Sequence, residues 1–293
     1  MTLRLRVHKL DLDLTLYPSF VLALMEPLNN GYVKVVGRGK GCKIRVEGRY
    51  LVTDCGEEEA LYWSGAWFQE KLDPGLVRRS YRWLVEALLE TYERLGLAVN
   101  PLEPLLMFIP IFLSQNTSYH TNVLRWCRSL WRISSDPLEI SRRAADVGRS
   151  YQLARLGSAV LCAASAIGRD YWRVRQKLIS CKWVGPKVAD AFLLFGLAVT
   201  NSVPVDKHFT RMVGRLGLWP DATPPRKDLC ARYKCPECPL AAKCLRRLAS
   251  EALGPLAGWV QTAFYLHDKL YCSAQRCSEC VLRPECRNQG LAP

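Results

Sequence analysis

The chain has 293 residues, 49% of them hydrophobic, and a formal net charge of +14 with an isoelectric point near 9.3. A chain of this length can bury a sizeable core, in one domain or, as we expect, in two or three, and its ordinary glycine and proline content argues against a disordered protein. The positive charge favours a polyanionic partner, most often nucleic acid, because contacts to phosphate give affinity that does not depend on base sequence.

The N-terminal part of the chain has the pattern of a small antiparallel sheet. Apolar and polar side chains alternate over residues 3–16, which is typical of a half-buried strand. The segments 33–36 and 44–46 flank the glycine-rich turn 37–41, as in a β-hairpin, and 49–52 adds a further strand.

Beyond this region, apolar residues recur at helical spacing. A helix is predicted over about 83–95, with Gly96 as its C-terminal cap. Further helices are expected at about 103–114, 117–132, 136–146, 149–167, 170–180, 186–198, 206–215 and 248–270, with a linker at 219–225. The longest apolar run, 104–113, is too short to cross a bilayer, and residues 1–9 lack the apolar core of a secretory signal. We therefore expect an intracellular, cytoplasmic protein without membrane contact.

One lysine and one aspartate in the segment 181–208 suit chemistry at a sugar carbon. Lys187 begins an apolar helix after a tight hairpin, and Asp206 follows nineteen residues later. Burial at a helix N-terminus lowers the pKa of an amine, and a neutral lysine is a nucleophile. The alternative for Lys187 is an exposed side chain paired with Asp190. Asp206 can stabilise developing positive charge on a sugar, can cap the helix that begins at Lys207, or can do both.

Two cysteine-rich segments form an internal repeat. Their four cysteines are separated by the same gaps of four, two and five residues: Cys230, Cys235, Cys238 and Cys244, then Cys272, Cys277, Cys280 and Cys286. A Cys-x2-Cys pair with two further cysteines is a strong indication of a metal site. Thirteen cysteines in an intracellular chain favour metal over a disulfide framework, although thermophiles also use intracellular disulfides. The other cysteines, Cys42, Cys55, Cys127, Cys162 and Cys181, are expected to be buried or free.

The segment 181–208 resembles the helix-hairpin-helix and Gly/Pro/Asp signature of the DNA base-excision glycosylase superfamily. The chain is most similar to its 8-oxoguanine DNA glycosylase/AP lyase branch, over residues 8–218 and 248–286. The resemblance implies an α+β fold, mostly α-helical, with an N-terminal antiparallel β-sheet domain and, here, two four-cysteine metal loops. It also implies that Lys187 is the nucleophile that forms an imine and that Asp206 is the acidic group required for base excision.

Four regions are expected from this resemblance. They are an N-terminal antiparallel β domain at 1–73, a helix at 74–100 that joins the C-terminal helical region, a helical barrel with the helix-hairpin-helix at 101–208, and a C-terminal helical region with both cysteine loops at 209–293. The partner expected in the cleft between the helical parts is double-stranded DNA with a damaged base, bound by a monomer.

The resemblance further implies a pocket for a base that has left the double helix. Gln261, Tyr265 and Asp268 are spaced to lie on one helix face. An amide can bind the Watson–Crick edge of a flipped base and an aromatic ring can stack on it. In the family, the residue matching Asp268 orients the histidine matching His208, which contacts phosphate. The alternative is an amphipathic helix whose polar residues face solvent.

Other residues are expected to contact DNA. They are Lys182, Val184 and Gly185 of the hairpin, either Gln115 or Asn116 in the gap left by the base, and Tyr151 as a wedge or as an ordinary core residue. The chain departs from the family at Trp183, which replaces the first hairpin glycine. Gln152 and either His120 or Thr121 stand where the family carries arginines that read the opposite cytosine. Residues 16–20 occupy the region of the glycine that distinguishes 8-oxoguanine.

The two quartets lead to separate cofactor expectations. The second is placed like the [4Fe-4S] loop of endonuclease III, so we expect a [4Fe-4S] cluster there. The first lies in an insertion, where a second [4Fe-4S] cluster or a structural zinc both fit.

Together these features predict a bifunctional DNA N-glycosylase and AP lyase of base-excision repair that excises 8-oxoguanine. One alternative is an endonuclease III-like glycosylase for oxidised or mismatched pyrimidines, which the match of residues 248–268 to the 8-oxoguanine branch disfavours. Another is a non-catalytic iron–sulfur protein that binds DNA or transfers electrons. The presence of both Lys187 and Asp206 disfavours it.

Overall fold

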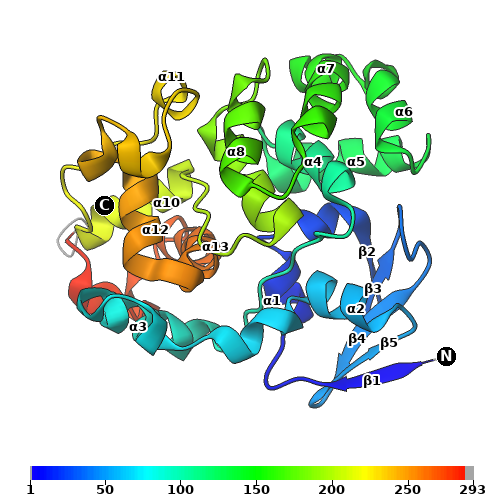
Figure 1. The fold of residues 1–293 in the computed structure, drawn as a ribbon. Helices are drawn as coiled ribbons and strands as arrows, with labels where there is room; N and C mark the ends of the chain where they lie inside the picture. Colours follow the sequence, from blue (N-terminus) through cyan, green and yellow to red (C-terminus); the bar gives the residue numbers. More distant parts are fainter. Residues whose placement is uncertain (1, 288–293) are drawn as a thin grey trace.

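A five-stranded antiparallel sheet occupies the N-terminal part of the chain in this computed structural model, which describes residues 2–287 (Figure 1). Its strands are β1 (Leu3–Arg6), β2 (Met25–Leu28), β3 (Gly31–Lys34), β4 (Lys43–Glu47) and β5 (Tyr50–Thr53), in the order β1-β5-β4-β3-β2. The predicted hairpin around the turn 37–41 and the strand after it are confirmed.

The strand predicted over residues 3–16 is wrong beyond Arg6. Leu12–Leu16 form the short helix α1, which Asp11 caps by accepting a hydrogen bond from the backbone N–H of Leu14 at 3.0 Å. Leu12 and Leu16 lie four residues apart and are both buried, so one face of this helix joins the core.

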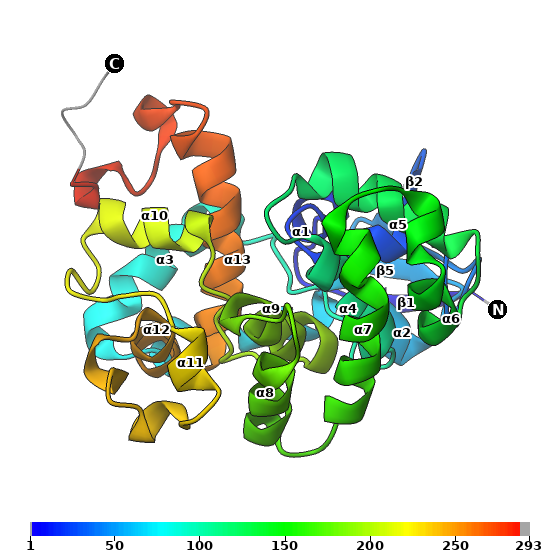
Figure 2. The ribbon, with the colours of Figure 1, turned by 90° about the horizontal axis from the view of Figure 1, so that it is seen from above.

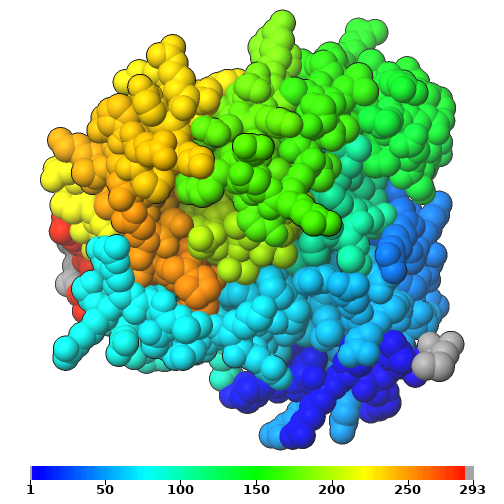
Figure 3. Space-filling view, viewed as in Figure 1, coloured from blue at the N-terminus to red at the C-terminus, as the bar shows by residue number. Residues whose placement is uncertain are grey.

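Two helices lead from the sheet toward the C-terminal half of the molecule. Helix α2 (Glu57–Ser64) is followed by α3 (Arg82–Tyr92), which packs against α13 (Ala257–His267). In the space-filling view, the cyan segment that contains α3 reaches the orange C-terminal segment (Figure 3). The N-terminal third of the chain therefore helps to build the C-terminal half.

The central helices lie inside their predicted ranges. They are α4 (Pro104–Leu113), α5 (Leu124–Trp131), α6 (Pro137–Arg142), α7 (Tyr151–Ala166), α8 (Tyr171–Ser180) and α9 (Pro186–Ala191). Eight residues of α4 are buried because it packs against α5, α6, α7 and α9. Neither α4 nor any other helix between residues 2 and 287 has both the length and the apolar character that crossing a membrane requires.

The C-terminal half contains α10 (Lys207–Leu216), α11 (Lys227–Cys230), α12 (Leu245–Leu253) and α13. The single helix predicted over 248–270 is wrong, because α12 ends at Leu253. Its C-cap Gly254 has a φ of +53°, and Pro255 cannot continue the hydrogen-bonding pattern of α12. Seen from above, these helices and α3 lie on one side, the sheet and α4–α7 on the other, with α8 and α9 between them (Figure 2).

Four of the cysteines outside the quartets, which were expected to be buried or free, form two disulfides. Cys42 and Cys55 flank the paired strands β4 and β5, which bring their Cα atoms to 5.1 Å, and Cys162 of α7 pairs with Cys181 at the end of α8, with Cα atoms 5.9 Å apart. Both separations are ordinary for disulfides. Cys127 is buried and unpaired, as expected.

Candidate active site

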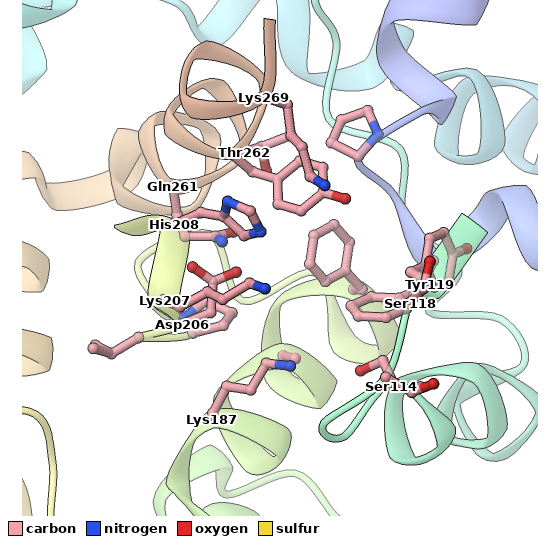
Figure 4. Close-up of a pocket in the computed structure, with 18 of the residues that line it drawn as sticks. Ser114, Ser118, Tyr119, Lys187, Asp206, Lys207, His208, Gln261, Thr262 and Lys269 are labelled. Carbon is pink, nitrogen blue, oxygen red and sulfur yellow. The ribbon is translucent and has the colours of Figure 1, made fainter. Parts of the chain in front are cut away.

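A cavity of about 640 Å³ lies where α9, α10 and α13 face the segment before α5 (Figure 4). The predicted site residues that line it are Asn116, Lys187, Asp206, His208, Gln261 and Tyr265. They come from four separate stretches of sequence, which the fold brings together around one cavity.

Lys187 lies in the first turn of α9 and its amine points into this cavity (Figure 4). Burial lowers the pKa of this amine, and the carboxylate of Asp206 partly opposes that shift. The alternative partner, Asp190, is fully buried and binds Arg175 and Arg246 instead. Lys187 is therefore not an ordinary surface lysine of an i,i+3 pair.

Asp206 caps α10 and also faces the cavity (Figure 4). Its Oδ1 accepts a hydrogen bond from the backbone N–H of Phe209 at 2.8 Å. The extended residues before it, Val203, Pro204 and Val205, are buried and fix the direction from which the carboxylate enters. Both roles considered for Asp206, helix cap and cavity carboxylate, are thus compatible in one conformation.

His208 is held by a buried carboxylate. The distance from His208 Nδ1 to Asp268 Oδ2 is 2.5 Å, and Arg211 contacts the same oxygen at 3.0 Å. Asp268 has no exposed surface and lies behind His208 rather than in the cavity wall, so it is a positioning residue. Burial lowers the pKa of His208, while its hydrogen bond to Asp268 acts in the opposite direction.

Aromatic residues form another wall. The ring of Tyr265 meets His208 edge-on at 4.7 Å between centroids, and its hydroxyl lies 3.5 Å from His120 Nε2. His120 in turn stacks on Tyr17 at 4.1 Å. Sequence reasoning had not placed His120 or Lys269 in the cavity. His120 belongs to a π-helical turn, Tyr119–Val123, which the sequence pattern did not predict.

The conformation of the loop before α5 distinguishes Asn116 from Gln115, the two residues considered for the gap left by a flipped base. Asn116 has a left-handed backbone, with φ of +48°, and lines the cavity. Gln115 points elsewhere, because its side-chain N–H donates to the Phe112 carbonyl at 2.9 Å. Its backbone carbonyl accepts hydrogen bonds from Gln152 at 2.9 Å and from the exposed Tyr151 at 3.5 Å. Asn116 is therefore the better placed of the two.

The hairpin between α8 and α9 differs from expectation at one residue. The side chain of Val184 is fully buried and its backbone N–H donates to the Cys181 carbonyl at 3.3 Å. Of the other hairpin residues predicted to contact DNA, Lys182 is exposed and Gly185 is partly exposed. Trp183 has φ of +70°, the region that glycine favours.

A buried ion network supports the helix that carries Lys187. Asp190 accepts hydrogen bonds from Arg175 of α8 at 2.7 and 2.8 Å and from Arg246 of α12 at 3.1 Å. All three side chains are almost completely buried. The network therefore ties α9 to two neighbouring helices, α8 and α12.

Asp190→Ala is expected to lower the free energy of unfolding by about 3–5 kcal/mol, because it leaves two buried guanidinium groups without their carboxylate. Urea unfolding followed by circular dichroism measures this. The control is Asp146→Asn, which breaks the exposed pair of Asp146 with Arg143 and should change stability by less than about 0.5 kcal/mol. Equal effects of the two substitutions would contradict a supporting role for the network.

The two cysteine quartets have the same backbone conformation. In the first loop, N–H to carbonyl bonds run from Cys238 to Cys235, from Ala241 to Cys238 and from Cys244 to Ala241. The second loop repeats this ladder from Cys277 through Cys280 and Arg283 to Cys286. The sequence repeat is therefore a structural repeat.

The sulfur atoms of each loop also lie near one another. Burial raises the pKa of Cys230 and Cys280, and neighbouring cysteines of the same loop raise it further. Within residues 2–287, neither quartet brings three sulfurs within 4.8 Å of one another.

The sequence matches no family model and no curated protein. The fold is similar to that of solved DNA glycosylases. The 8-oxoguanine glycosylase/lyase of Clostridium acetobutylicum, solved with double-stranded DNA containing cytosine opposite 8-oxoguanine, is 15% identical, with a TM-score of 0.63 over 92% of this chain and 98% of that chain. The 3-methyladenine DNA glycosylase of Archaeoglobus fulgidus is 13% identical, with a TM-score of 0.63 over 91% and 98%. The mostly helical α+β glycosylase fold predicted from the sequence is confirmed.

Proposed function

We propose that the protein is a base-excision-repair DNA glycosylase with AP lyase activity that removes 8-oxoguanine from double-stranded DNA. The observation that carries this proposal is the convergence of the Lys187 amine and the Asp206 carboxylate on one cavity. Its volume of about 640 Å³ lies within the usual range for small-molecule sites. The similarity of the fold to glycosylases supports the same class of reaction.

In the proposed reaction, the damaged nucleotide rotates into the cavity, where Gln261 binds the base edge and Tyr265 stacks on the ring. Asp206 stabilises the positive charge that develops on the sugar. A bond forms between Lys187 Nζ and C1′ while the bond from C1′ to the base nitrogen breaks, and the base leaves with the electron pair and takes a proton. Ring opening then gives an imine, and loss of a C2′ proton expels the 3′ phosphate.

Release of free base from defined duplexes tests the proposal. We expect excision from duplexes that contain 8-oxoguanine and strand cleavage at abasic sites. Excision confined to an oxidised pyrimidine would instead support the endonuclease III-like alternative. No excision from any damaged duplex would overturn the glycosylase proposal and leave a non-catalytic DNA-binding role.

The pH dependence of imine formation provides a further prediction. The amine reacts only when neutral, and burial lowers the pKa of Lys187 from its ordinary value of 10.5. Reactivity should therefore persist well below pH 10.5 and fall only as the pH drops through the lowered value. Asp206→Asn removes a charge that raises this pKa, so its acid limb should lie at still lower pH. Borohydride trapping rates on an abasic duplex measure both limbs, and a limb near pH 10.5 would contradict the prediction.

We also propose a [4Fe-4S] cluster at the second quartet and a second cluster or zinc at the first. Either group would supply a structural anchor, and neither is needed for the steps assigned to Lys187 and Asp206. The cysteines fit either group through their repeated turn geometry and through the four thiols that each loop supplies.

Metal analysis of purified variants tests these sites. Cys280→Ser is expected to remove about four iron atoms and part of the absorption at roughly 400 nm, because all four thiolates bind the cluster. Cys235→Ser should remove iron or zinc and so identify the first metal. Cys127→Ala, at a buried unpaired cysteine outside both loops, is the matched control and should retain all metal. Unchanged metal content in both loop variants would refute both sites.

A further inference from the structure

Trp183 is an exposed tryptophan in a strained backbone conformation. Its φ of +70° lies in the left-handed region, where a side chain larger than that of glycine is disfavoured. The side chain is 38% exposed, so burial of the indole does not account for the strain. Strain of this kind at the surface is a reason to look for a function of the side chain.

The indole of Trp183 holds two cations. The guanidinium carbon of Arg155 lies 3.6 Å from the ring centroid, and the Lys182 amine lies 4.9 Å from it. Arg155 also lies 4.7 Å from the ring of Tyr151, so two aromatic rings fix its position. Within the described chain, neither Arg155 nor Lys182 forms an ion pair with a carboxylate. Both positive charges therefore remain available to an anion.

This group lies beside the candidate active site. Lys187 lies four residues after Trp183 in the chain. Within the same group, Tyr151 contacts the carbonyl of Gln115, which precedes the cavity residue Asn116. The disulfide between Cys162 and Cys181 joins α7, which carries Arg155, to the start of the hairpin. The relative position of the two cations is thus fixed by a covalent link as well as by the rings.

We propose that Arg155 and Lys182, held by Trp183 and Tyr151, form a side-chain clamp for a phosphate of the DNA backbone beside the candidate active site. This inference rests on the proposed function and adds residues that the hairpin resemblance does not supply. A guanidinium stacked on an aromatic face keeps its N–H edge free for a phosphate, and a fixed side chain loses less entropy on binding. In this clamp, the side chains of Arg155 and Lys182 bind the phosphate that a glycine at position 183 would allow to approach the backbone closely.

Binding of an undamaged fluorescent duplex at several salt concentrations tests the clamp. Arg155→Gln should reduce the slope of log Kd against log salt concentration by about one, because one phosphate contact is lost. Trp183→Gly should leave the slope unchanged, since both cations remain, but weaken binding about two- to fivefold because they are no longer held. The matched control is Arg4→Gln, which removes an exposed arginine stacked on Tyr50 in the sheet and should change neither quantity.

Urea unfolding of Trp183→Gly separates binding from folding. The stability of the variant should stay within about 1 kcal/mol of the wild type, because relief of backbone strain at positive φ offsets the lost ring contacts. The clamp would be overturned if Arg155→Gln kept the wild-type slope or if Trp183→Gly kept the wild-type affinity. A larger loss of stability in Trp183→Gly would also overturn it, since weaker binding would then follow from unfolding. Since the duplex is undamaged, this result is independent of base excision, and failure of the proposed catalysis would be seen separately in the base-release assay.

Discussion

Lys187→Gln is expected to abolish covalent trapping by borohydride and to reduce cleavage at abasic sites by roughly 10³-fold or more, because an amide nitrogen cannot attack the sugar. The measurement is the yield of a protein–DNA adduct on a denaturing gel after reduction with an abasic duplex. Lys177→Gln, at an exposed lysine of α8, is the control and should trap normally. Retention of trapping in Lys187→Gln would remove the nucleophile from the proposed mechanism.

The direction in which Lys187→Gln changes the free energy of unfolding can also be predicted. The pKa of Lys187 is lower in the folded protein than the ordinary value of 10.5, so the folded state binds this proton more weakly than the unfolded state does. Below the folded pKa the protonated amine opposes folding, and the opposition is relieved as the pH rises toward 10.5. Lys187→Gln should therefore unfold at neutral pH at the same or a higher urea concentration than the wild type. Marked destabilisation of Lys187→Gln would contradict the conclusion that the Lys187 amine is desolvated in the folded protein.

Asp206→Asn is expected to slow excision of 8-oxoguanine by about 10²–10³-fold, since it removes a negative charge beside the developing positive sugar. Asparagine is as good a helix cap as aspartate, so α10 should keep its start and the protein its stability. Strand cleavage at a pre-formed abasic site should fall much less, because no base has to leave.

Single-turnover rates on the two duplexes give this comparison directly. Asp206→Ala is the companion variant, which should lose excision to a similar extent and also about 1 kcal/mol of stability through the missing cap. Equal slowing of both reactions by Asp206→Asn would mean that the carboxylate acts on the lyase step or on folding, contrary to the role proposed for it.

Sequence reasoning identified the residues that local spacing determines. Lys187 and Asp206 belong to one continuous hairpin–helix–turn segment, and Gln261 and Tyr265 lie four residues apart on α13, so their relation follows from backbone geometry. His208 follows Asp206 by two residues and enters the cavity with it. These are the parts of the site that need no knowledge of distant contacts.

The residues that sequence reasoning missed depend on contacts between distant segments. His120 reaches the cavity because it stacks on Tyr17, more than 100 residues earlier in the chain. The partners of Asp190 come from α8 and α12, 15 and 56 residues away. The disulfides form because strand pairing and the packing of α7 on α8 bring cysteines together. No local pattern contains this information.

The identity of the lysine that carries the trapped sugar tests the central claim most directly. The wild-type protein, reduced with borohydride on an abasic duplex, digested and analysed by mass spectrometry, should carry the sugar fragment on the peptide that contains Lys187. Lys207 and Lys269 also line the cavity and are the competing sites. An adduct on either of them, with Lys187 unmodified, would contradict the account.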